Sequence, residues 1–144
     1  MHGMTREQTL EFNREAIETF RHNGGAMPAG HPLHGNPTLL LTSTGAKTGC
    51  VRISPLTFTE DGDEFIVMAS AGGSPTLPAW AVNLRAHPEV VIEVGEERFE
   101  AIAVETVGAA RERALQLMTT ALPRFATYQS AVDRVIPLFR LRRR

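Results

Sequence analysis

The sequence predicts a mainly β fold of the α+β class, an antiparallel barrel of about six strands with helices at its margins. The strand-like runs are joined mostly by short hairpin turns, and the regular strand–helix alternation of a parallel doubly wound sheet is missing. Closing such a meander into a barrel also removes the exposed sheet edges. With 144 residues and 42% hydrophobic residues, the chain can bury the core of one domain.

Residues 1–36 are expected to form an N-terminal helix and an irregular linker, ahead of a barrel domain at residues 37–144. Thr5–Gln8 has the form of a capping box, so the helix should run from there to about His22 and end at Gly24-Gly25. Its apolar stripe is narrow and its charges are mixed. Packing against its own domain is therefore favoured over contact with a membrane or a partner.

The linker contains His31 and His34, a pair that invites a metal-binding interpretation. No acidic residue or cysteine accompanies them within the linker, so we expect no metal there. Three prolines and four glycines between residues 24 and 37 predict an irregular path.

The first two strands are predicted from apolar runs at Thr38–Ser43 and Val51–Phe58. In the second run the apolar residues are at Val51 and Ile53, then at Leu56 and Phe58. The alternation therefore changes phase across Pro55, which predicts a β-bulge at that proline.

The remaining elements follow from turn residues and from apolar spacing. Glu60–Asp63 has the composition of a hairpin turn, and Phe65–Ala69 is apolar on both faces, which predicts a central strand. Ala71–Ser74 is expected to break the sheet. The other expected elements are a helix from Pro78 to about Arg85, paired strands Val90–Val94 and Arg98–Thr106, helices Ala109–Leu122 and about Phe125–Val132, and a last strand Val135–Leu141.

The connection between the first two strands is the most informative stretch for function. Residues 42–49 hold four hydroxyl side chains, two glycines and Lys47, and Arg52 follows. Such a turn can present backbone N–H groups, hydroxyls and cations to an anion, so it predicts a site for the phosphate of a nucleotide-like cofactor. An ordinary polar hairpin turn is the alternative. A P-loop is excluded because Ala46 separates Gly45 from Lys47 and a strand follows where a helix is required.

The composition excludes several classes of protein. A net charge of −1 at pH 7 gives no reason to expect nucleic-acid binding, and a single cysteine, Cys50, excludes an internal disulfide framework or a cysteine-based zinc cluster. No signal peptide or membrane-spanning run is visible, so a cytoplasmic location is expected. The C-terminal arginines are expected to form a solvated tail, and weak attraction to anionic lipid headgroups is the alternative.

Four motifs, in their order and spacing, resemble those of a known family. They are Leu39–Gly49 with Arg52 and Pro55-Leu56; Ala69–Gly73 followed by Pro78–Trp80 and Asn83-Leu84; His87–Val90; and Tyr128-Gln129 followed by Asp133-Arg134 and Ile136-Pro137. They look like the deazaflavin-dependent nitroreductase family, whose members are split β-barrel proteins that bind coenzyme F420. The resemblance covers roughly residues 37–138 and implies a split β-barrel here.

The resemblance also implies an activity and a site. Reduced F420 would transfer a hydride to a quinone-like, nitroaromatic or activated unsaturated acceptor, and Lys47, Thr48 and Arg52 would hold the acidic tail of the cofactor. Ser70 and Tyr128 are the implied catalytic donors. The full cofactor-binding set is Thr44, Gly45, Lys47, Thr48, Gly49, Arg52, Pro55, Ala69, Ser70, Ala71, Gly72, Gly73, Pro78, Ala79 and Trp80.

The chain departs from the family pattern at several positions. Ala46 and Ala71 stand where members can carry basic residues, Leu77 stands where His or Asn is common, and of the pocket positions Leu122, Phe125 and Tyr128 only the last keeps a hydroxyl. Reduction of bulky nitroaromatic prodrugs is therefore not expected.

Four alternatives stay open. A non-catalytic deazaflavin or FMN carrier is the alternative function, and FMN is the alternative cofactor because it shares the tricyclic ring and the ribityl phosphate. Trp80 has a competing role as a core anchor. Both a monomer and a homodimer remain compatible with the sequence.

Overall fold

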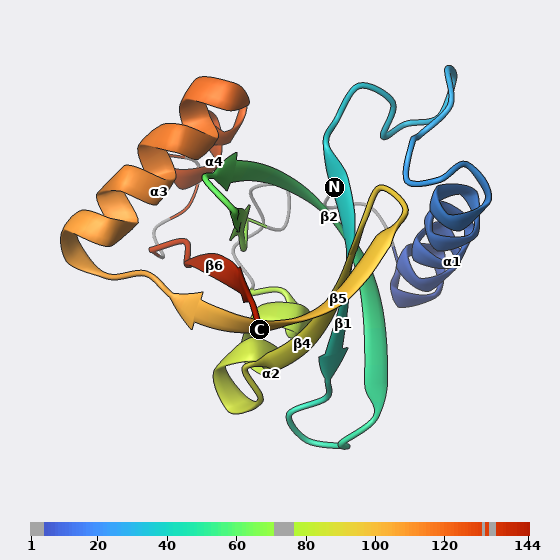
Figure 1. Ribbon diagram of the computed structural model, residues 1–144, viewed down its shortest axis with the longest axis horizontal. Helices are drawn as coiled ribbons and strands as arrows, with labels where there is room; N and C mark the ends of the chain where they lie inside the picture. The colour runs from blue at the N-terminus through green and yellow to red at the C-terminus, as the bar shows by residue number, and fades with distance from the viewer. Residues whose placement is uncertain (1–4, 71–76, 131, 133–134) are drawn as a thin grey trace.

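The computed structural model describes residues 5–70, 77–130, 132 and 135–144. In these residues six antiparallel strands close into a barrel in the spatial order β1-β2-β3-β6-β5-β4, with four helices around it (Figure 1). The strands are β1 Thr38–Thr44, β2 Val51–Asp61, β3 Glu64–Met68, β4 Glu89–Val94, β5 Glu97–Glu105 and β6 Leu138–Arg143. The helices are α1 Arg6–His22, α2 Ala79–Ala86, α3 Gly108–Ala121 and α4 Phe125–Ser130. The predicted fold class is confirmed.

The barrel is filled and covered by different sets of residues. Its interior is lined by one cluster that includes Leu39, Leu41 and Phe139, while α3 and α4 cover a second cluster on the outside. β3 contributes Val67 to the first cluster and Ile66 and Met68 to the second. The strand lies between β2 and β6, so the prediction of a central strand that is apolar on both faces is confirmed.

The predicted bulge at Pro55 is wrong. The ladder between β1 and β2 runs without interruption from Thr38 opposite Thr57 to Thr44 opposite Val51. The apolar phase changes because both faces of β2 are covered: Ile53 faces outward into the cluster under α1, and Phe58 belongs to the barrel interior. A regular strand covered on two sides thus gives the same sequence pattern as a bulged strand covered on one.

The helix α1 packs on the outside of β1 and β2, on the opposite side of the barrel from α3 and α4 (Figure 1). Its capping box is present, with the Thr5 side chain accepting from the Gln8 amide and the Gln8 side chain accepting from the Thr5 amide. Ala16 and Phe20 are buried against Leu40. Burying a phenylalanine contributes roughly 1.5–3 kcal/mol, which is enough to hold a helix whose other faces are polar.

Two boundaries and one surface differ from the sequence-based expectation. Pro78 is the N-cap of α2 instead of its first helical residue. β6 begins at Leu138 because Pro137, without an N–H group, cannot donate to the ladder. The predicted solvated arginine tail is wrong: Arg142 and Arg143 lie in β6 and, like the buried Arg140, make ion pairs. The expected sheet break at residues 71–74 lies outside the described residues.

Candidate functional site

The β1–β2 loop is held in shape by its own hydrogen bonds. The Gly45 amide donates to the Cys50 carbonyl at 2.7 Å, and the Gly49 amide donates to the Gly45 carbonyl at 2.9 Å. The Cys50 amide donates to Thr48 Oγ1 at 3.1 Å. Both glycine amides are therefore engaged inside the loop. They serve its geometry, whereas the sequence suggested that they would receive a ligand.

Gly45 and Gly49 are required for different reasons. A Cβ at the buried Gly45 would lie 2.7 Å from Thr48 Oγ1 and 3.2 Å from the Cys50 carbonyl oxygen, which is too close for any side chain without a shift. Gly49 has space around it, but its φ of 73° lies in the left-handed region that glycine adopts most readily. One glycine permits close packing and the other permits the turn.

The loop is fastened to α2 by Asn83. The Ala46 amide donates to Asn83 Oδ1 at 2.9 Å, and Asn83 Nδ2 lies 3.5 Å from Ser43 Oγ in β1. Asn83 is buried, with 7% of its surface exposed. The sequence analysis missed this role and quoted Asn83 only as part of a motif. The available signal was a polar residue between Ala81 and Leu84, which form the buried side of α2.

Two cations stand at this end of the barrel without an acidic partner. Lys47 and Arg52 are exposed, and neither makes an ion pair within the described part of the chain. Arg52 lies opposite Ser43 in the β1–β2 ladder, so its side chain leaves the sheet on the face where Asn83 contacts Ser43. Thr48 is also exposed at the loop tip. This donor set fits an anionic group such as a phosphate or a carboxylate.

Other predicted cofactor contacts lie on the flanking elements. Thr44, at the end of β1, is half-buried, while Pro55 lies in the middle of β2 opposite Leu40, on the outer face that α1 covers. Pro78 and Trp80 are half-buried at the start of α2, and Ala79 is exposed. The Trp80 ring packs in a T-shaped arrangement with Phe139 with 5.9 Å between ring centroids, so it is anchored to the core.

The two catalytic candidates come from α4 and from the segment that follows β3. Tyr128 is a half-buried residue of α4 whose ring packs edge-to-face on Phe125 at 4.9 Å. Ser70 is buried and follows Ala69, whose amide donates to the Pro137 carbonyl. Continuing the alternation of β3 puts Ser70 on the face of Ile66 and Met68, the face that also packs with Tyr128. The predicted ring contacts Ala71, Gly72 and Gly73 lie outside the described residues.

The described residues contain no group of three or more histidine, cysteine or carboxylate side chains that could hold a metal ion. His31 Nε2 instead contacts Glu15 at 2.9 Å, and His34 Nδ1 contacts the Met27 carbonyl at 2.8 Å. No described helix is long and apolar enough to cross a membrane. Two surface hollows occur beside α1, and no residue of the β1–β2 loop lines either of them.

Comparison with known proteins gives consistent matches. The family model described as F420H(2)-dependent quinone reductase matches residues 12–142. A curated F420H(2)-dependent quinone reductase of Mycobacterium tuberculosis is 41% identical over 119 residues, which cover 80% of each chain. The solved structure of the F420-H2 dependent reductase FDR-A has 38% identity and a TM-score of 0.68, covering 73% of this chain and 93% of its own. A structure described as a domain-swapped dimer has 35% identity and a TM-score of 0.70, covering 89% and 92%.

Proposed function

The chain belongs to the F420H(2)-dependent quinone reductase family, and from this premise we propose that it is an oxidoreductase that uses reduced coenzyme F420 to reduce quinones. The observation that carries the proposal is the match over residues 12–142 together with the loop that this match includes. The loop presents Lys47, Thr48 and Arg52, without acidic partners in the described residues, to an incoming ligand.

The residues at this loop fit the acidic tail of F420. Charge-assisted hydrogen bonds from Lys47 and Arg52 would hold its phosphate and glutamate groups. The Thr48 hydroxyl already accepts from the Cys50 amide, and its own proton remains available to a phosphate oxygen. Pro78, Ala79 and the exposed part of Trp80 would border the rest of the cofactor, at the start of the helix that also fastens the loop.

The bound cofactor supplies the hydride, and the chain supplies orientation and donors. Negative charge develops on the quinone oxygen as the hydride arrives, so a hydroxyl aimed at that oxygen lowers the barrier. Tyr128 and Ser70 are the candidate donors in this role. Tyr128 packs on the cluster under α3 and α4, and the alternation of β3, continued past its end at Met68, would put Ser70 on the same side, which supports the assignment.

The alternative is a non-catalytic carrier of F420 or FMN. Tyr128 is the only tyrosine in the chain, and this scarcity of pocket hydroxyls favours the alternative and also argues against bulky nitroaromatic acceptors.

A cytoplasmic location, with weak contact with the inner membrane surface, belongs to the same proposal. The pairing of Arg140, Arg142 and Arg143 with acidic side chains weakens the case for lipid contact. A homodimer is supported by the relative described as a domain-swapped dimer, and a sedimentation measurement tests it.

The proposal is tested by titrating the purified protein with F420 and with FMN, and then mixing it rapidly with reduced F420 and a panel of quinones. We expect binding of F420 in preference to FMN and faster oxidation of the reduced cofactor in the presence of a quinone. Tight binding without acceleration by any acceptor would replace the enzyme with a carrier. Preference for FMN would overturn the cofactor assignment.

The variant Tyr128→Phe tests the donor. Loss of one such hydrogen bond lowers turnover by about ten- to a thousandfold, with F420 affinity unchanged. The ring contact with Phe125 is retained in this variant, so the melting temperature should stay near that of the unmodified protein. Ser130→Ala, at an exposed position of the same helix, is the control that should turn over normally. Normal turnover in Tyr128→Phe would leave Ser70 or solvent as the donor.

A further inference from the structure

The hydrogen bonds of the β1–β2 loop divide its backbone amides into two groups. The amides of Gly45, Gly49 and Cys50 donate inside the loop, and that of Ala46 donates to Asn83. The remaining two, those of Lys47 and Thr48, have no hydrogen-bond partner in the part of the chain that the structure describes. They are neighbours at the exposed tip, so the loop is closed at its base and open at the place where an anion would arrive.

Asn83 is the only side chain from outside the loop that bonds to a loop amide within the described residues. It is buried, and it belongs to a helix that is itself fixed to the barrel through Ala81 and Leu84. The same helix carries Trp80, whose ring packs on Phe139 in the barrel interior. The Ala46 amide is thus tied to the rigid core by one hydrogen bond of 2.9 Å.

We propose that Asn83 is a positioning residue that sets the loop in its anion-binding shape before the cofactor arrives. By holding the Ala46 amide, it fixes the direction of the next two amides, those of Lys47 and Thr48, toward the ligand. A loop ordered in advance loses less conformational freedom on binding, and this raises its affinity for the ligand. The inference rests on the proposed F420 function for the identity of the ligand and on the bonds above for the role.

The first test uses the protein without cofactor. Amide hydrogen exchange of Ala46 should be several-fold faster in Asn83→Ala than in the unmodified protein, because the amide loses its acceptor. In Asn83→Asp an oxygen acceptor remains at the same place, and the protection of Ala46 should return. Equal protection of Ala46 in Asn83→Ala and in the unmodified protein would overturn the proposal.

The second test measures F420 affinity without any acceptor. Asn83→Ala should bind F420 about two- to tenfold more weakly, by an amount that does not change with salt. Asn83→Asp should also bind F420 more weakly, because its added negative charge repels the acidic cofactor tail. This loss of affinity, relative to the unmodified protein, should become smaller as salt increases. Unchanged affinity in Asn83→Ala would overturn the positioning role.

A matched control separates positioning from general destabilisation. Thr106→Val removes another buried side chain to backbone hydrogen bond, from Thr106 Oγ1 to the Leu138 carbonyl, and Thr106 makes no hydrogen bond to the loop in the described residues. This variant should lose stability and keep both the Ala46 exchange rate and the F420 affinity. If Asn83→Ala fails to fold, Asn83→Leu, which has a similar branched shape and also lacks the acceptor, takes its place in both tests with the same expected results. Absence of F420 binding by the unmodified protein would refute the proposed function alone, since the exchange experiment does not use the cofactor.

Discussion

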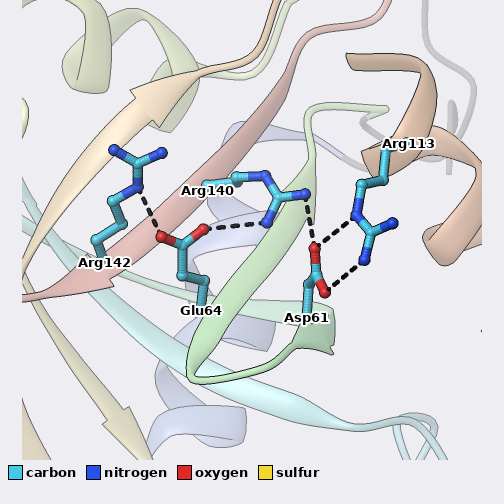
Figure 2. A network of polar contacts seen from close by, with 5 residues as sticks. All are labelled: Asp61, Glu64, Arg113, Arg140 and Arg142. Carbon is cyan, nitrogen blue, oxygen red and sulfur yellow. Dashed lines mark hydrogen bonds and ion pairs between the residues drawn. The ribbon is translucent and has the colours of Figure 1, made fainter. Parts of the chain in front are cut away.

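The cationic side chains near the two ends of β2 lie in opposite settings. Near its start, Arg52 and the neighbouring Lys47 are exposed and unpaired in the described residues. At its other end, roughly 30 Å away along an extended strand, Asp61 binds Arg113 through two bonds of 3.0 Å and Arg140 through one of 2.9 Å. Figure 2 shows how Glu64 extends this network to Arg142.

The difference separates cations that stabilise the chain from cations that can bind a ligand. When a guanidinium is already paired with a carboxylate, its N–H groups are engaged. The neighbouring negative charge of the carboxylate also repels an anionic ligand. The Asp61 network joins the β2–β3 hairpin to β6 and to α3, so its natural role is to hold these elements together. The side chains of Lys47 and Arg52 make no ion pair in the described part of the chain, so their charges are available for recognition of a ligand.

The largest effect is expected at the unpaired end. Replacing Lys47 or Arg52 by alanine removes a charge-assisted contact to the cofactor tail and should weaken F420 binding by about ten- to a hundredfold. Fluorescence titration with F420 measures this loss, which should be smaller at high salt because partly exposed charges are screened. The melting temperature of either variant should change little, since neither side chain makes an ion pair among the described residues.

Arg142→Ala is the matched control for these variants. It removes one exposed arginine with the same formal charge from the paired end, where Arg142 contacts Glu64 at 2.7 Å. F420 affinity should stay the same. If Arg142→Ala weakened binding as much as Arg52→Ala, net charge alone would explain the affinity, and the distinction between the two ends would fail.

A smaller effect, on stability instead of binding, is expected at the paired end. Arg140 is 9% exposed and bonds to both Asp61 and Glu64, so Arg140→Ala leaves two carboxylates without their shared partner. The free energy of unfolding should fall by about 1–3 kcal/mol in urea denaturation, with F420 affinity unchanged. A stable variant that binds F420 poorly would mean that the network supports the site instead of the fold.

Local signals predicted most of the fold. The capping box at Thr5–Gln8 and the β2–β3 hairpin involve neighbours in sequence, and both occur, although the predicted turn at Glu60–Asp63 is shorter because β2 extends to Asp61 and leaves only Gly62-Asp63 in the turn. The bulge at Pro55 failed because apolar alternation does not say which face a helix will cover. The arginine tail failed because its partners are distant in sequence: Glu97 lies 46 residues before Arg143, and Glu64 and Asp61 lie 76 and 79 residues before Arg140.

The site was predictable only in part for the same reason. Lys47 and Arg52 are close in sequence to the glycines that shape the loop, so the pattern identified an anion-binding candidate. Asn83 bonds to Ala46 across 37 positions, so its place between Ala81 and Leu84 could indicate that it is buried but not which group it contacts. Only the barrel, which brings α2 against β1, gives this side chain its contact.

The smallest effect concerns the pH dependence of the paired end. The Arg113 guanidinium, with help from Arg140, lowers the pKa of Asp61 from 3.8 to about 2. A carboxyl with a lowered pKa in the folded state stabilises that state while it is ionised. The contribution of Asp61 is therefore complete above about pH 4 and is lost as the pH falls towards 2.

Asp61→Asn tests this window. The variant should be less stable than the unmodified protein at pH 7, and the difference should shrink as the pH falls below 4 and vanish near 2, as followed by urea denaturation at each pH. Glu60→Gln, one residue earlier on the same strand and exposed, is the control and should show no such convergence. F420 affinity at pH 7 should be the same in all three proteins. A constant gap at every pH would mean that Asp61 acts through packing or neutral hydrogen bonds, and the contrast between the two ends of β2 would no longer be one of charge.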